Sequence, residues 1–115
     1  MQARNSTRGV VLADRLEWAG TSESRKRGLL GRSQFDPGQG IYIAPTQWIH
    51  MIGMRFPIDV AFLDGNGRVL ALHHGLKPNR FSRIVLRADG ALELPAGTLA
   101  ASGTMVGDTV VFEGE

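Results

Sequence analysis

Residues 48–64 read WIHMIGMRFPIDVAFLD and form the most apolar stretch of the chain. Only His50, Arg55, Asp59 and Asp64 within it can carry a charge. Because burial of apolar surface contributes about 25 cal/mol per Å², this stretch is expected to lie mostly inside the protein. Polar side chains in such surroundings need hydrogen-bond partners or a function. The stretch is therefore both the centre of the predicted fold and the first place to look for a site.

Short apolar runs separated by turns continue on both sides of this stretch. Fifteen glycines in 115 residues indicate many tight turns and chain reversals. The sequence DGNG at 64–67 predicts a hairpin turn, because aspartate, asparagine and glycine tolerate positive φ. Residues 81–86 fit a short strand or a helical turn. Strands are predicted at 9–12, 16–19, 40–44, 58–63, 68–73, 91–94 and 109–113, and short helices at 25–30 and 98–102.

This pattern predicts a mainly β fold, a compact sandwich or barrel-like domain with one or two short helices. Residues 1–8 are polar and are expected to form a flexible N-terminus, followed by a single β-rich domain over 9–115. The start of the chain has no apolar run typical of a signal peptide, and no run is long enough to span a membrane. The expected location is the cytoplasm, with no membrane partner.

Composition excludes several kinds of chemistry. The chain has no cysteine, which excludes disulfides, thiolate nucleophiles and cysteine metal sites. Its net charge of +2 is small and spread along the chain, so nucleic acid is not an expected partner. Basic residues form two loose groups, at 25–32 and 77–87, which fit a solvated face or an anion site.

Asp59 lies in the predicted strand 58–63. Alternation places it on the same face as Ala61 and Leu63, where a carboxylate is costly unless it is paired or hydrogen-bonded. Two interpretations follow. Asp59 either orients His50 or Arg55 in a ligand pocket, or it satisfies backbone N–H groups at a strand crossing and stabilises the fold.

The candidate ligand-binding residues are His50, Met54, Arg55 and Asp59. Arg55 would supply charge and His50 a switchable hydrogen-bonding group, within an otherwise apolar wall. His73 and His74 are adjacent, and adjacent strand residues point to opposite faces, so they do not predict a metal site. No metal or other cofactor is expected.

Several ordered motifs resemble the domain-of-unknown-function 192 family of small prokaryotic proteins. They are RxxGLLGR at 25–32, IHxxGMRFPIDVxFLD at 49–64, LELPAG at 92–97 and GDxV at 107–110, and the resemblance runs over about residues 9–112. It implies a compact β-rich domain with a short helix near the N-terminus, and it implies no established reaction. The family positions carried over are Arg25, Gly28, Gly31, His50, Met54, Arg55, Pro57, Asp59, Asp64, Glu93, Gly97, Gly107 and Asp108.

Three functions remain open at this point. The first is a binding module for a small polar or anionic ligand or a peptide, using the four candidate residues. The second is a metal-independent enzyme with His50 as base and Asp59 as its orienter. The third is a structural or interaction domain without a pocket, which an exposed apolar patch near residues 81–86 and self-association into a homodimer would favour.

Overall fold

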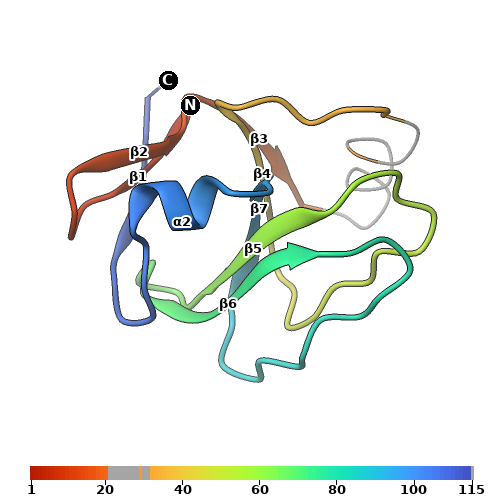
Figure 1. Cartoon of the computed structure of the whole chain (residues 1–115). Helices are drawn as coiled ribbons and strands as arrows, with labels where there is room; N and C mark the ends of the chain where they lie inside the picture. The colour runs from red at the N-terminus through yellow and green to blue at the C-terminus, as the bar shows by residue number, and fades with distance from the viewer. Residues whose placement is uncertain (21–28, 30–31, 115) are drawn as a thin grey trace.

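The computed structural model describes residues 1–20, 29 and 32–114. The strands of this part of the chain form two sheets (Figure 1). The smaller sheet has the order β2-β1-β8 and the larger one β3-β4-β7-β5-β6. All neighbours are antiparallel except β3 and β4, which run parallel. The elements are β1 (Gln2–Asn5), β2 (Val10–Ala13), β3 (Arg15–Ala19), β4 (Gln39–Ile43), β5 (Ile58–Leu63), β6 (Val69–Leu76), β7 (Gly90–Pro95), α2 (Thr98–Ser102) and β8 (Val110–Glu113).

The strand predicted at the centre of the chain lies inside the protein. Every residue of β5 and of its neighbour β7 is buried, because apolar clusters cover both faces of the larger sheet at this point. Ala61 and Leu63 belong to one cluster, and Val60 and Phe62 to the cluster on the other face. This alternation confirms the predicted pleat of residues 58–63.

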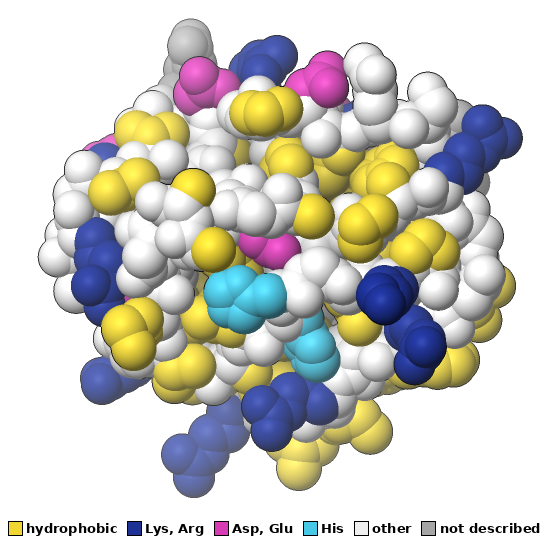
Figure 2. Space-filling view, in the orientation of Figure 1, with side chains coloured by type: hydrophobic (Ala, Val, Ile, Leu, Met, Phe, Trp, Pro, Cys, Tyr) yellow, Lys and Arg dark blue, Asp and Glu magenta, His cyan; other side chains and the backbone are white. Residues whose placement is uncertain are grey.

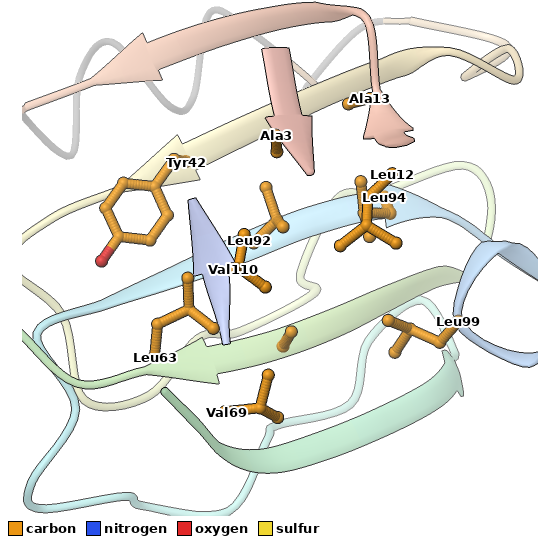
Figure 3. Close-up of a cluster of buried hydrophobic side chains, with 11 residues drawn as sticks. Ala3, Leu12, Ala13, Tyr42, Leu63, Val69, Leu92, Leu94, Leu99 and Val110 are labelled. Carbon is orange, nitrogen blue, oxygen red and sulfur yellow. The ribbon is translucent and has the colours of Figure 1, made fainter. Parts of the chain in front are cut away.

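The first cluster joins the two sheets. Figure 3 shows Leu92 and Leu94 of the larger sheet gathered with Leu12 and Val110 of the smaller one. Leu99, which is fully buried, brings α2 into the same cluster. The mainly β fold is therefore confirmed, as two packed sheets with a short helix rather than a closed barrel.

The predicted hairpin turn is present between β5 and β6. The backbone N–H groups of Asn66 and Arg68 both donate to Asp64 Oδ1 at 2.9 Å, and Gly67 has a φ of 81°. A glycine accepts this left-handed conformation without strain. Asp64 therefore fixes the turn through its side chain as well as its position.

The expectation of a flexible N-terminus over residues 1–8 is wrong for β1. This strand is the middle one of the smaller sheet and pairs with both β2 and β8. Asn5 is fully buried, and its Nδ2 donates to Thr104 Oγ1 and Asp108 Oδ2, both at 3.0 Å. The side-chain partners of Asn5 lie about a hundred residues away, so the local sequence does not reveal them.

Two further predictions concern helices and loops. The predicted helical turn at 98–102 is α2, whereas most of the predicted helix at 25–30 lies outside the described residues. Residues 81–86 form neither a strand nor a helix, apart from one isolated bridge between Phe81 and His50. In the part of the chain that the structure describes, no helix is long and apolar enough to cross a membrane.

Tyr42, the chain's only tyrosine, is almost completely buried in β4. Its hydroxyl donates to Asp89 Oδ2 at 2.9 Å. The neighbouring Gly90 makes room for it, because a Cβ at that position would stand 2.5 Å from the tyrosine hydroxyl oxygen. Burial, and then the hydrogen bond and the charge of Asp89, raise the pKa of Tyr42 well above its ordinary value of 10.0.

We expect the Tyr42 phenolate to form only when the protein unfolds at alkaline pH. A raised pKa means that this group stabilises the fold fully below pH about 10. The stabilisation is lost as the pH rises further, because there the unfolded chain releases the proton and the folded chain does not. Ultraviolet absorbance reports this phenolate alone, and circular dichroism reports the fold. Phenolate that appears near pH 10 in a chain that keeps its β signal would contradict the expectation.

Candidate binding surface

The carboxylate of Asp59 is held by backbone N–H groups from three places in the chain. Its Oδ1 accepts from Gly75 N at 2.8 Å, at the end of β6. Its Oδ2 accepts from Gly97 N at 3.0 Å and Leu99 N at 2.9 Å, where β7 turns into α2. The side chain is buried, at 1% exposure. These contacts match the interpretation in which Asp59 satisfies backbone donors, and they leave the carboxylate little capacity to orient His50 or Arg55.

The other candidate residues lie in different environments. Met54 is half-buried and packs against two of the apolar clusters together with Phe56. Arg55 is exposed. His50 is half-buried, its Nδ1 accepts from Ile52 N at 3.4 Å, and its ring lies 6.2 Å from that of Trp48. Of the four predicted residues, Arg55 is exposed, His50 and Met54 are half-buried, and Asp59 is buried.

His50 belongs to a pair of antiparallel segments that covers one face of the larger sheet. We call residues 47–53 and 79–86 the outer ribbon. Four backbone hydrogen bonds of 2.8–2.9 Å hold its two segments together: Met51 N to Arg80 O, Asn79 N to Met51 O, Ser82 N to Ile49 O, and Val85 N to Gln47 O. The hydroxyl of Ser82 also accepts from Ile49 N at 2.9 Å.

Side chains alternate along the first segment of the outer ribbon. Ile49 and Met51 are 1% exposed and pack in the cluster that covers β5. Trp48 and Ile52 point the other way and are 45% and 53% exposed. This alternation follows from the extended backbone. It leaves the apolar side chains of Trp48 and Ile52 in contact with water, which stabilises the protein less than their burial would.

The second segment adds to this apolar surface. Phe81, Ile84 and Leu86 are exposed, Leu86 most of all, and the rings of Phe81 and Trp48 lie 6.1 Å apart. Contiguous exposed apolar side chains of this kind mark interaction sites more often than scattered ones do. Both segments contain several large apolar residues, but no local pattern predicts that the two segments pair.

The outer ribbon is also joined to the sheet beneath it by His73. The backbone N–H of Arg83 donates to His73 Nε2 at 3.3 Å, and the ring of His73 meets Phe62 edge to face at 6.2 Å. Burial, and then the charge of Arg83, lower the pKa of His73 below its ordinary value. A neutral ring is the form that can accept this hydrogen bond. Among the residues whose structure is described, no three His, Asp or Glu side chains gather to hold a metal ion.

The charged side chains of the outer ribbon and of the residues that flank it directly in sequence are basic. Residues 47–58 and 77–88 contain no aspartate or glutamate. They carry five basic residues, all of them exposed: Arg55, Lys77, Arg80, Arg83 and Arg87. Figure 2 shows Lys and Arg side chains beside histidines on one face of the molecule, with hydrophobic side chains between them. The exposed apolar side chains of the outer ribbon therefore lie in a cationic environment.

Comparisons with known proteins support the fold. A family model, DUF192, described as "Uncharacterized ACR", matches residues 3–112. A crystal structure of a protein of unknown function from Novosphingobium aromaticivorans DSM 12444 is similar, with a TM-score of 0.80 and 22% identity over 96% of this chain and 82% of that one. A structure described as "a putative transcription regulator" from Sinorhizobium meliloti 1021 has a TM-score of 0.77 and 24% identity over 96% and 89%. No curated protein matches the chain.

Proposed function

Because the chain belongs to the domain-of-unknown-function 192 family, to which these comparisons attach no reaction, we propose from its own surface that it is a peptide-binding module. The outer ribbon binds an acidic segment of a partner protein that also carries apolar side chains. One observation carries this proposal. Trp48 and Phe81 are exposed with their rings 6.1 Å apart, on two segments that carry basic residues and no acidic one.

The two kinds of side chain on this surface have different roles in the proposed complex. Trp48 and Phe81 supply large apolar areas, which often dominate binding energy when a partner covers them. Arg80 and Arg83 supply guanidinium groups, which match carboxylate geometry and favour an acidic partner over a basic one. The predicted residues His50 and Arg55 join this proposal as polar groups within and beside the outer ribbon. Met54 and Asp59 contribute to it by supporting the fold.

The enzyme alternative has less support in the contacts observed. It requires Asp59 to orient His50, whereas both oxygens of Asp59 accept hydrogen bonds from backbone N–H groups. A small anionic ligand would use the same arginines as the peptide, but it would leave the exposed aromatic and aliphatic side chains without a role. An acidic, partly apolar peptide accounts for both.

We expect the protein to bind a synthetic peptide that alternates glutamate with leucine and phenylalanine. Phe81→Ser and Trp48→Ser variants are expected to bind it at least about tenfold more weakly, since truncated aromatic anchors cost at least that much. Fluorescence anisotropy of the labelled peptide measures the affinity. Met105→Ser is the matched control for Phe81→Ser. Met105 is 59% exposed and Phe81 is 60% exposed, but Met105 lies outside the outer ribbon.

Three results would contradict this proposal. One is equal binding of a peptide with lysine in place of glutamate. Another is an unchanged affinity in both aromatic variants. The third is binding of anionic vesicles or single-stranded DNA without binding of the acidic peptide, which would assign the cationic surface to a different class of partner.

A further inference from the structure

A hollow of about 400 Å³ has a lining that includes no residue of the outer ribbon. It opens where β3, β4 and β8 meet the hairpin turn at 64–67. Three aromatic side chains, Trp18, Tyr42 and Phe112, line it together with the carboxylates of Asp64 and Asp89. No part of the proposed peptide site contributes to this lining.

The three rings form one connected wall. Their centroids lie 4.7 Å apart for Trp18 and Tyr42, 4.7 Å for Tyr42 and Phe112, and 5.2 Å for Trp18 and Phe112. The planes of Trp18 and Phe112 are nearly perpendicular, at 79°. Trp18 is 51% exposed although its neighbour Tyr42 is almost fully buried. An accessible aromatic surface with an electron-rich face is therefore available beside the hollow.

The two carboxylates give the hollow a negative charge. Asp64 Oδ1 accepts the N–H groups of the turn, and Asp89 Oδ2 accepts the hydroxyl of Tyr42. The described hydrogen bonds thus use one oxygen of each carboxylate. Among the residues that the structure describes, no lysine, arginine or histidine lines the hollow.

The backbone around the hollow leaves little freedom to close it. Val110 N donates to Gly67 O at 2.8 Å, which joins the hairpin turn to β8. A Cβ on Gly67 would collide with the carbonyl oxygen of Val110. Asp89 is held next to the turn, because its N–H donates to Leu63 O at 2.7 Å. The aromatic wall and both carboxylates are therefore fixed on paired backbone.

We propose that this hollow binds an organic ammonium group, such as a methylated amine. The aromatic wall supplies cation–π attraction and apolar contact for the methyl groups, and Asp64 and Asp89 supply the opposing charge. Trp is the aromatic side chain that attracts cations most strongly, and here it is the most accessible of the three. A neutral ligand of the same shape gains only the apolar contact.

Choline and its uncharged carbon isostere, 3,3-dimethylbutan-1-ol, test this proposal as a matched pair. Trp18 fluorescence reports binding. The chain has two tryptophans, so the measurement uses a Trp48→Phe background in which Trp18 is the only one left. Choline is expected to give a saturable change that the isostere does not give. An Asp64→Asn, Asp89→Asn double variant is expected to weaken choline binding about tenfold or more, a difference that exceeds experimental error in such titrations.

The asparagine substitutions keep an oxygen that accepts the same hydrogen bonds, so the turn and Tyr42 retain their partners. Circular dichroism and thermal unfolding verify that the double variant is folded. If it does not fold, Trp18→Leu replaces it, since this side chain is half exposed. Choline binding to this variant is measured by isothermal titration calorimetry, because the substitution removes the fluorescent reporter. Equal responses to choline and its isostere, no saturation with choline, or unchanged affinity in the variants would overturn the proposal. None of these outcomes bears on peptide binding by the outer ribbon.

Discussion

Asp59→Ala is expected to lower the free energy of unfolding by about 3 kcal/mol or more, because each backbone N–H left without an acceptor inside a protein costs about 1–3 kcal/mol. Three such groups, on Gly75, Gly97 and Leu99, depend on this carboxylate. They belong to the end of β6 and to the turn between β7 and α2, so the loss reaches both elements. Chemical denaturation followed by circular dichroism measures it.

The control is Asp14→Ala, which removes a carboxylate from an exposed position. Its ion pair with Arg15 is 3.4 Å long, with both side chains more than 60% exposed, and exposed pairs of this kind contribute about 0–1 kcal/mol. If Asp59 mainly positioned His50 in a site, Asp59→Asn would leave stability nearly unchanged and abolish ligand binding. The contacts predict the opposite: a destabilised protein that, where it is folded, still binds the acidic peptide.

Ala3→Asp is expected to destabilise the protein by several kcal/mol or prevent folding, because it places an unpaired carboxylate in the core. Ala3 is fully buried in the cluster between the two sheets. It pairs with Ala13 of β2 on one side and Phe112 of β8 on the other. Thermal unfolding monitored by circular dichroism shows whether a cooperative transition survives.

Ala100→Asp makes the same chemical change on the exposed side of α2 and should cost less than about 1 kcal/mol. The comparison separates a buried strand from a flexible tail. A frayed N-terminus would tolerate Ala3→Asp as well as α2 tolerates Ala100→Asp. Equal stability of the two variants would therefore contradict the position of β1 in the middle of the smaller sheet.

Local sequence patterns predicted the elements whose conformation depends on residues close together in the sequence. The strand at 58–63 was predicted with the bounds that β5 has, because a run that is apolar except for Asp59 lies between Pro57 and a turn. The turn at 64–67 was predicted from aspartate, asparagine and glycine, and Asp64 makes the expected contacts with its own backbone neighbours. In both cases the deciding interactions span only a few residues.

Predictions failed or stayed open where the partners are distant in sequence. Gln2–Asn5 reads as a polar tail, yet Asn5 bonds to Asp108, and Arg4 Nε lies 2.8 Å from a carboxylate oxygen of Glu113. One interpretation of Asp59 gave it His50 or Arg55 as a partner. The other gave it backbone N–H groups, which is what the contacts match, and these donors lie 16 to 40 positions further along. The outer ribbon likewise joins segments about 30 residues apart.

The proposed role of the outer ribbon rests on large apolar side chains that are exposed to solvent although the fold does not require it. Trp48, Ile52 and Phe81 remain in solvent, although Ile49 and Met51 between them are buried. Alternation along an extended segment explains which side chains point outward, but it does not explain why those side chains are large and apolar. Binding of a partner would explain it, because the partner covers this surface.

The most direct test is a titration of the isotope-labelled protein with the acidic peptide, followed amide by amide by NMR. We predict that the shifts that change with saturation belong to the outer ribbon, at 47–53 and 79–86, while those of the turn at 64–67 and of α2 stay in place. Shifts that cluster around the hairpin turn or around Asp59, or no saturable shifts at peptide concentrations where the anisotropy changes, would contradict the account.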